Sequence, residues 1–449
     1  MRPVVTEVRG DSRLPNAVDL VVIGGGIIGC SAAFWAAEQG LRVALVEKGR
    51  IAGEQSGRNW GWVRRMGRAA AEYPLGIESL KLWQGLNERT ARDTGFRRGG
   101  IVYAARTDRE RAWLAGVEAE AARFGLAVAR MDKAALAATF PGARLSDTEG
   151  LMTADDGRAE PALAAPALAE GARDKGAVLL TGCAVRTLET EAGQVSAVVT
   201  ERGVIRCRAV ILAAGAWSRL FCGNLGIDLP QVRIRSSVLR TAPVKGGPEL
   251  ALGNGRFGIR PRLDGGYTVA RRGRTPVQLT PDVLRQAPRF ARGLLKNRRE
   301  IALTLDGSLI EDLRTPRTWQ GDAITPFEAC RVLDPEPQGA ILARALRDVA
   351  QAFPALDGVQ VLERWGGIID VTPDGVPVID HAPGLPGLVI ATGFSGHGFG
   401  LGPGAGQLAG ELATGRTTLV DPAPFRLDRF GGGRTATARQ GAIAQPPTP

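Results

Sequence analysis

Short apolar runs alternate with segments of helical spacing along the first part of the chain. Asp19–Ile23 and Arg42–Val46 are rich in branched apolar residues, which is typical of strands buried on both faces. The segment between them has the composition of a buried helix. The order strand, helix, strand predicts a βαβ unit with a parallel sheet.

The rest of the chain continues the same two patterns, segments of helical spacing and short apolar runs typical of strands. Helical spacing predicts helices over Leu75–Arg92, Arg109–Phe124, Glu160–Lys175, Thr280–Arg299 and about Gly404–Thr414. Apolar or alternating runs predict strands over Val178–Leu180, Val195–Thr200, Arg208–Trp217, Arg233–Thr241, Gly266–Arg271 and Leu388–Gly393. The runs that reach Gly215 and Gly393 are as apolar as the first strand, so we expect buried strands that return to it.

A glycine motif connects the first strand to the first helix. Gly24 permits a tight turn, Gly26 lets the backbone approach a pyrophosphate, and Gly29 lets the helix pack close to the sheet. Glu47 ends the second strand, where a carboxylate can accept hydrogen bonds from a ribose. These positions predict a dinucleotide site, with a plain glycine-rich βαβ turn as the alternative.

The apolar strands near both ends of the chain predict one α/β, Rossmann-like domain built from separated pieces. A second, α+β domain with a mixed or antiparallel sheet is inserted between them. The expected division is a flexible leader at 1–17, the nucleotide domain at 18–90, 150–225 and 365–425, the substrate domain at 91–149 and 226–364, and a disordered tail at 428–449.

Composition excludes several classes of protein. The chain has 449 residues, no apolar run long enough to span a membrane and no secretory signal. Its five cysteines are scattered, which argues against a metal site or disulfide framework and fits the cytoplasm. The net charge of +11 indicates either a solvated basic surface or attraction to an anionic partner, with no nucleic-acid module visible. Thr280–Arg299 is either a basic surface helix or a docking face for a partner or the inner face of a membrane.

Three segments resemble the D-amino-acid oxidase superfamily, which includes glycine oxidase and monomeric sarcosine oxidase. They read VVIGGGIIGCSAAFWAAEQGLRVALVEKG, ILAAGAWS and TPDGVPVIDHAPGLPGLVIATGFSGHGFGLGPGAGQLAGELATG. The resemblance covers about residues 18–425. It implies FAD as the cofactor, held noncovalently here because no cysteine lies near Gly367, where monomeric sarcosine oxidase carries its flavin-linked cysteine.

The resemblance also implies a set of flavin contacts from six parts of the chain. They are Gly24, Gly26, Ile27, Ile28, Gly29, Glu47, Lys48, Ser56, Asn59, Trp60, Gly61, Val185, Ala214, Gly215, Trp217, Gly393, Gly396, His397, Gly398, Phe399 and Gly400. The glycines after residue 393 bring backbone N–H groups and a helix N-terminus to the ligand, which suits negative charge on a reduced flavin.

The substrate residues are expected in the loop over residues 56–65, which resembles the GRN…R stretch of sarcosine oxidase β-subunit-like proteins. The resemblance implies that Arg64 grips the substrate carboxylate, with Arg65 as the competing candidate. Trp60 is expected to wall the site, and Tyr267 to contact the substrate. His397 is the histidine expected to hydrogen-bond flavin or substrate.

Departures from the family pattern refine the expected chemistry. The stretch Gly396-His397-Gly398 lacks the carboxylate-binding arginine of glycine oxidase, and Gly400 replaces a lysine of monomeric sarcosine oxidase. Ala270 stands where that oxidase has the lysine that promotes oxygen reduction. This favours a dehydrogenase that passes electrons to a quinone or partner protein over one that uses oxygen.

The expected reaction is FAD-dependent oxidation of the C–N bond of an amino acid or N-substituted amino acid. Hydride leaves the α-carbon for the flavin, and the resulting imine hydrolyses. The alternatives are a flavin dehydrogenase of hydroxy acids, because one fold hosts many chemistries, and a flavin-bearing subunit of a larger amine dehydrogenase complex.

Overall fold

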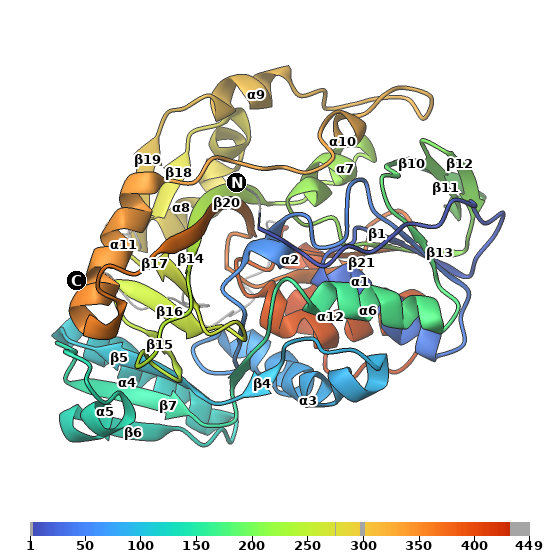
Figure 1. Ribbon diagram of the computed structural model, residues 1–449. Helices are drawn as coiled ribbons and strands as arrows, with labels where there is room; N and C mark the ends of the chain where they lie inside the picture. The colour runs from blue at the N-terminus through green and yellow to red at the C-terminus, as the bar shows by residue number, and fades with distance from the viewer. Residues whose placement is uncertain (1–2, 274, 297–300, 432–449) are drawn as a thin grey trace.

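The computed structural model describes residues 3–273, 275–296 and 301–431, and two large sheets organise it (Figure 1). The first has six strands in the order β21-β22-β13-β1-β2-β9. They are β1 (Leu20–Ile23), β2 (Val43–Val46), β9 (Val178–Leu180), β13 (Ala209–Leu212), β21 (Val378–His381) and β22 (Leu388–Thr392). All neighbouring pairs are parallel except β21–β22. The expected return of two distant apolar strands to β1 is therefore confirmed.

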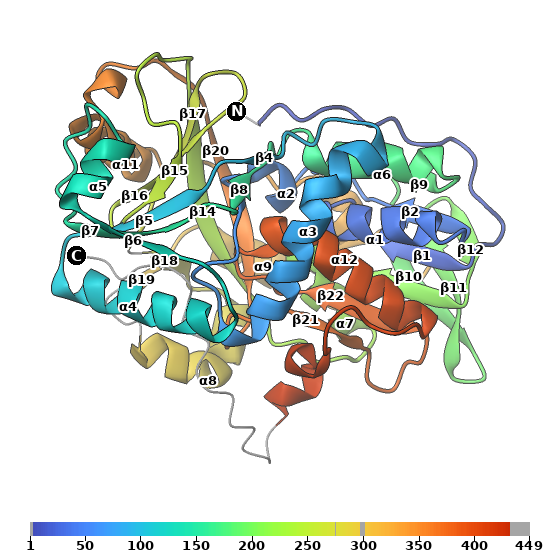
Figure 2. The same cartoon turned by 90° about the horizontal axis from the view of Figure 1, so that it is seen from below.

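Side chains of the six-stranded sheet alternate between two apolar layers because successive strand residues face opposite sides. Leu20 and Val22 pack with the helices α1 (Ile27–Glu38), α3 (Tyr73–Thr90), α6 (Ala164–Asp174) and α12 (Gly398–Thr414). Val21 and Ile23 pack on the other side with α7 (Ser218–Asn224) and a small sheet of β10 (Val185–Glu191), β11 (Gln194–Thr200) and β12 (Gly203–Arg206). Figure 2 shows α3, α12 and α1 side by side.

Helix α12 begins at Gly398, earlier than the predicted start near Gly404. Its glycines lower helix propensity, but they let α12 approach α1 closely. A Cβ at Gly406 would lie 2.5 Å from Ser31 Cβ, and one at Gly410 would lie 2.3 Å from Trp35 Cε3. Close packing thus overrides the local preference.

The predicted start of α6 at Glu160 is also too early, because the helix begins at Ala164. Glu160 instead makes a buried, bidentate ion pair with Arg260 of the second sheet, at 2.8 and 3.0 Å. This ion pair connects the two parts of the protein.

The second sheet has eight strands in the order β20-β14-β17-β16-β15-β5-β7-β6. They are β5 (Ile101–Ala105), β6 (Ala129–Asp132), β7 (Glu149–Thr153), β14 (Val232–Thr241), β15 (Ala251–Gly253), β16 (Phe257–Pro261), β17 (Tyr267–Arg271) and β20 (Val361–Val371). The sheet is mixed, since β15–β5 is parallel and the other pairs are antiparallel. Helices α4 (Asp108–Arg123), α5 (Lys133–Thr139) and α11 (Gly339–Ala352) lie against it. The α/β fold with an inserted mixed sheet is confirmed, although β7 and all of β20 lie in this second sheet, beyond the expected domain boundaries at 150 and 365.

Shorter elements join the two sheets or extend from the second. Near the junction lie α2 (Gln55–Arg58), α10 (Pro326–Ala329), β3 (Trp62–Val63), β4 (Arg97–Arg98) and β8 (Gly157–Arg158). The outer segment holds β18 (Thr275–Gln278), α8 (Pro281–Lys296), β19 (Ile301–Thr304) and α9 (Ser308–Arg314). Single 3₁₀ turns lie at Ala70–Glu72, Gly215–Trp217, Pro354–Leu356, Ala423–Phe425 and Leu427–Phe430.

The expected leader is a docked segment over residues 3–17. Val8 is buried in the core, and the backbone of Asp11 donates a hydrogen bond to the carbonyl of Leu179 at 2.6 Å. At the other end, Arg429 pairs with Asp374 at 2.8 Å, so the first residues of the expected tail also pack on the protein. Residues 432–449 lie outside the described part.

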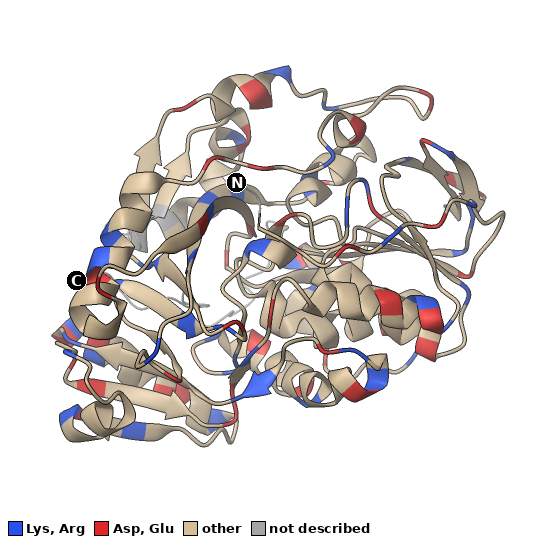
Figure 3. Cartoon of the chain, viewed as in Figure 1, with Lys and Arg blue, Asp and Glu red and all other residues tan. Residues whose placement is uncertain are grey.

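Acidic and basic residues are interspersed along the ribbon in both halves of the protein (Figure 3). Many arginines pair with carboxylates, as Arg186 does with Glu328 at 2.8 Å. Of the described helices, none is long and apolar enough to cross a bilayer.

Candidate functional site

A cleft of about 2010 Å³, counting the part open to solvent, lies at the carboxyl ends of β1, β2 and β13, between the two sheets. Most predicted flavin contacts line it. They are Gly24, Gly26, Ile27, Ile28, Glu47, Lys48, Ser56, Asn59, Trp60, Val185, Ala214, Gly215, Trp217, Gly396, His397, Gly398, Phe399 and Gly400. Segments far apart in the sequence thus meet around one continuous space.

The dinucleotide end of the cleft is held by hydrogen bonds to its acidic residue. Glu47 accepts hydrogen bonds from the backbone N–H groups of Gly25 and Gly49, both at 2.7 Å. Burial raises the pKa of Glu47, and the positive charge of Lys48 opposes this rise. The carboxylate is therefore fixed at the end of β2, where it can also accept from a ribose.

Glu54 organises the neighbouring wall and was missed in the sequence because no motif contains it. Its carboxylate accepts hydrogen bonds from Lys48 Nζ at 2.8 Å and from Trp217 Nε1 at 3.0 Å. Lys48 Nζ also lies 4.3 Å from the centre of the Trp217 ring. Lys48 thus orients Trp217 as well as lining the cleft.

Three predicted contacts lie behind the lining and shape it. A Cβ at Gly29 would lie 1.9 Å from the carbonyl oxygen of Gly24, so this glycine holds α1 against the turn. Gly61 accommodates the carbonyl of Ala159 in the same way. Gly393 donates a backbone hydrogen bond at 2.7 Å to Asp370, a buried cleft residue that sequence analysis missed.

The substrate end of the cleft contains a different set of arginines from the predicted one. Arg65 does not line the cleft, because its Nε pairs with the buried Asp156 at 3.0 Å. Tyr267 is also absent from the lining among the described residues and packs in the core of the eight-stranded sheet. Arg64 does line the cleft, although its Nη1 donates to the carbonyls of Met66 and Gly67 at 2.5 and 2.8 Å.

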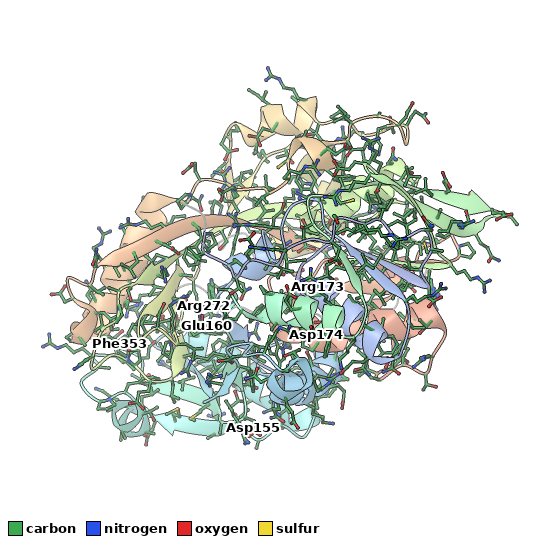
Figure 4. All side chains as sticks on the ribbon, turned by 45° about the vertical axis from the view of Figure 1, so that its right-hand side comes forward. Asp155, Glu160, Arg173, Asp174, Arg272 and Phe353 are labelled. Atoms are coloured by element: carbon green, nitrogen blue, oxygen red, sulfur yellow. The ribbon has the colours of Figure 1, made fainter. Side chains whose placement is uncertain are left out.

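Arg272 is a cleft arginine whose side chain hydrogen-bonds to Tyr103 and still has two nitrogens without an acceptor among the described residues. It follows β17 and lies near the middle of the molecule in Figure 4, beside the junction of the two sheets. Only 3% of it is exposed, and no described residue accepts a hydrogen bond from its Nε or Nη1. Gly253 makes room for the guanidinium, since a Cβ there would lie 2.2 Å from Nη1.

Aromatic rings surround this guanidinium. Its carbon lies 5.8 Å from the ring centres of Trp60 and Trp62 and 5.1 Å from that of Tyr103. Burial lowers the pKa of Arg272 to about 10, which leaves it charged at neutral pH. A buried cation with unused donors can bind an anion, and a carboxylate fits its planar fork.

A second set of buried charged groups lies at the N-terminus of α12. His397 Nδ1 lies 3.1 Å from one carboxylate oxygen of Glu72 and 3.2 Å from the other. Arg68, whose Nη1 has no described hydrogen-bond acceptor, approaches Glu72 at 3.9 Å. His397 was predicted from its motif, whereas Arg68 and Glu72 were not, because only tertiary packing brings them to it.

The geometry of the cleft fits FAD. It has close backbone approach at Gly26, a fixed acid at Glu47, and an α12 N-terminus whose N-cap residue gives no side-chain cap. It also contains unused buried donors such as Trp62 Nε1. The described residues contain no cluster of ligands that could hold a metal ion, and none of the five cysteines lines the cleft.

Comparison with known proteins also indicates an FAD-dependent oxidoreductase. A family model described as FAD dependent oxidoreductase, DAO, matches residues 19–412. N-methyl-L-tryptophan oxidase from Salmonella arizonae is 28% identical over 92% of this chain and 99% of its own. The structure of L-amino acid deaminase from Proteus myxofaciens in complex with anthranilate is 32% identical, with a TM-score of 0.91 over 96% of this chain and 97% of that chain. L-amino acid deaminase from Proteus vulgaris is 29% identical, with a TM-score of 0.89 over 94% and 100%. The chain belongs to the DAO family of FAD-dependent oxidoreductases.

Proposed function

We propose that this protein oxidises the C–N bond of an amino acid or N-substituted amino acid, with Arg272 holding the substrate carboxylate. The observation that carries the proposal is a buried guanidinium with unused donors on the same cleft as the dinucleotide motif. The relatives of this protein include an N-methyl amino acid oxidase and an amino acid deaminase whose structure contains anthranilate, an aromatic carboxylate.

When bound, FAD supplies the acceptor for the hydride that leaves the α-carbon. The residues of the chain bind and orient the substrate. Arg272 fixes the carboxylate, and the earlier candidate, Arg64, lies on the same cleft as a second cation. Trp60, Trp62 and Tyr103 provide apolar walls, which favour a substrate with a large apolar side chain and exclude water.

Anaerobic titration of the flavin tests the proposal. D-, L- and N-methyl amino acids should be compared with the matching 2-hydroxy acids at equal concentration. Bleaching by the amino acids alone is the expected result. Bleaching by hydroxy acids alone would place the enzyme among C–O dehydrogenases, and bleaching by neither series would contradict a catalytic role.

The flavin is expected to dissociate when the protein is denatured by acid or heat. The physical reason is that none of the five cysteines lines the cleft, so the thioether that monomeric sarcosine oxidase forms near the position of Gly367 has no thiol from which to form here. Absorbance of the supernatant and the pellet after precipitation measures this directly. Yellow colour retained by washed, denatured protein would show a covalent bond of another kind.

The electron acceptor is proposed to be a quinone or partner protein rather than oxygen. Ala270 is buried against Val238 and Trp365. Lys48 is the only lysine among the described cleft residues. Its ammonium group already donates hydrogen bonds to Glu54 and to two backbone carbonyls. We expect stopped-flow reoxidation of the reduced enzyme by a soluble quinone to be at least about tenfold faster than by dissolved oxygen. Faster reoxidation by oxygen than by the quinone would indicate that the enzyme is an oxidase.

The outer segment that follows β17 suits a lipid surface where such a quinone would reside. Large apolar side chains are exposed on it, at Leu284, Leu295, Leu303, Leu305, Ile310 and Leu313, beside Arg285 and Arg289 of α8. Flotation with anionic vesicles checks this contact. Leu284→Glu with Leu313→Glu should weaken it, whereas Val204→Glu on the distant β12 should not. Equal vesicle binding by all variants would indicate that α8 is an ordinary solvated surface helix.

A further inference from the structure

The pair of His397 and Glu72 is buried within the wall of the cleft. The side chain of Glu72 is fully inaccessible, and that of His397 retains 9% exposure. One oxygen of Glu72 also accepts the backbone N–H of Ala69 at 3.2 Å, which fixes the carboxylate at the start of α3. His397 is the N-cap residue of α12, so both partners are held by helix ends.

The surroundings determine which ring nitrogen carries the proton. Burial acts to raise the pKa of Glu72, but the hydrogen bond with His397 and the positive charges of Arg68 and Arg64 lower it overall. An ionised carboxylate can only accept hydrogen bonds, so Nδ1 of His397 carries the hydrogen. Burial lowers the pKa of His397 against the opposing effect of Glu72, which keeps the ring neutral at neutral pH. Its Nε2 then has an unprotonated lone pair.

We propose that Nε2 of His397 accepts the proton of the substrate's ammonium group, with Glu72 as the partner that stabilises the imidazolium. The proposal rests on the proposed function, because it requires an amino acid in the cleft. The charged groups that face the pair are Arg64 and Arg68, and Arg272 lines the same cleft. A neutral amine is needed because only its lone pair can assist departure of hydride from the α-carbon.

The step is a proton transfer alone. The N–H bond of the ammonium breaks, its electron pair stays on nitrogen, and a new N–H bond forms at Nε2. Nothing is oxidised or reduced, and the proton leaves later to solvent. The guanidinium groups lower the pKa of a nearby ammonium and also that of His397, so Glu72, which acts to raise the pKa of His397, is the group that favours transfer to the ring.

Imidazole NMR tests the proposal without turnover. The chain has two histidines, so the FAD-loaded His381→Asn variant leaves His397 as the single signal. The ligand is an α-methyl amino acid, which has an ammonium and a carboxylate but no α-hydrogen. We expect the ¹⁵N shifts to change from a neutral ring with hydrogen on Nδ1 to an imidazolium on binding at pH 7. The added Glu72→Gln change should prevent this, and a ring that stays neutral with ligand bound would overturn the proposal.

The pH dependence of flavin reduction provides a second, independent measurement. His397→Gln should slow reduction by an amino acid about 10²–10³-fold at pH 7, the range of general base catalysis. The rate should recover as pH rises through the pKa of the free amine, because the substrate then arrives deprotonated. His381→Gln, an exposed position on β21, is the matched control. An equal loss at every pH would overturn the proposal, whereas a wild-type enzyme that no amino acid reduces would instead contradict the proposed function.

Discussion

Replacing Arg272 with methionine is expected to lower kcat/KM for amino acid substrates by roughly 30- to 5000-fold while leaving FAD bound. The substrate carboxylate would lose a buried, charge-assisted partner, and such losses cost about 2–5 kcal/mol. Methionine fills much of the same space between the aromatic rings, so the cleft keeps its walls. Steady-state kinetics with flavin content measured in parallel checks the result. Arg272→Lys should recover part of the loss, because a point charge does not replace a planar fork.

The neighbouring residue supplies a matched control for this experiment. Arg271 lies on β17 beside Arg272, but its side chain pairs with Asp348 of α11 and does not line the cleft. Arg271→Met should therefore leave KM within about twofold, since the side chain of Arg271 does not line the cleft. If Arg64→Met proves far more damaging than Arg272→Met, then Arg64 holds the carboxylate, as the family resemblance first implied.

Replacing Gly29 with alanine is expected to remove most of the bound FAD from the purified protein. The added Cβ would lie 1.9 Å from the carbonyl oxygen of Gly24 and 3.3 Å from Val22 Cγ1. Either α1 or the glycine turn must shift, and overpacking of this kind costs about 1–3 kcal/mol of stability. Flavin absorbance per chain and the thermal midpoint of unfolding measure the two effects.

Gly116 of α4 offers the same substitution without a clash. No atom lies within 4 Å of a Cβ added there, so Gly116→Ala should keep full flavin content. It should also stabilise the protein by about 0.5–1 kcal/mol, because alanine loses less entropy than glycine in a helix. Stoichiometric flavin in Gly29→Ala would show that the turn tolerates movement and that the predicted close approach is not required for binding.

The dinucleotide end of the site could be predicted because its signal is local. Gly24, Gly26 and Glu47 stand at fixed places in one βαβ unit, and backbone geometry alone gives each a role. The start of α12 could not be predicted, because glycine disfavours helices and only the approach of α1 makes Gly406 and Gly410 favourable there.

The substrate end depends on contacts that no local pattern encodes. Arg64 and Arg65 are adjacent and chemically alike, yet one lines the cleft and the other pairs with Asp156. Arg272 belongs to no sequence motif, because its place in the cleft depends on the space left by Gly253 and on the rings of another segment. Glu72 carries no motif, and its partner lies far along the chain.

The six-stranded sheet has a consequence for how the protein is made. Synthesis proceeds from the N-terminus, so β1, β2 and α1 emerge long before β22 and α12 are translated. Until then β13 lacks its outer neighbour, and the surface of α1 around Ser31 and Trp35 lacks the glycines that cover it. A nascent chain of the first 350 residues therefore exposes an apolar helix face and a strand edge, both of which favour aggregation. The cofactor cleft is completed only by the last part of the described chain, which contributes Gly396, His397 and Gly398 to its lining.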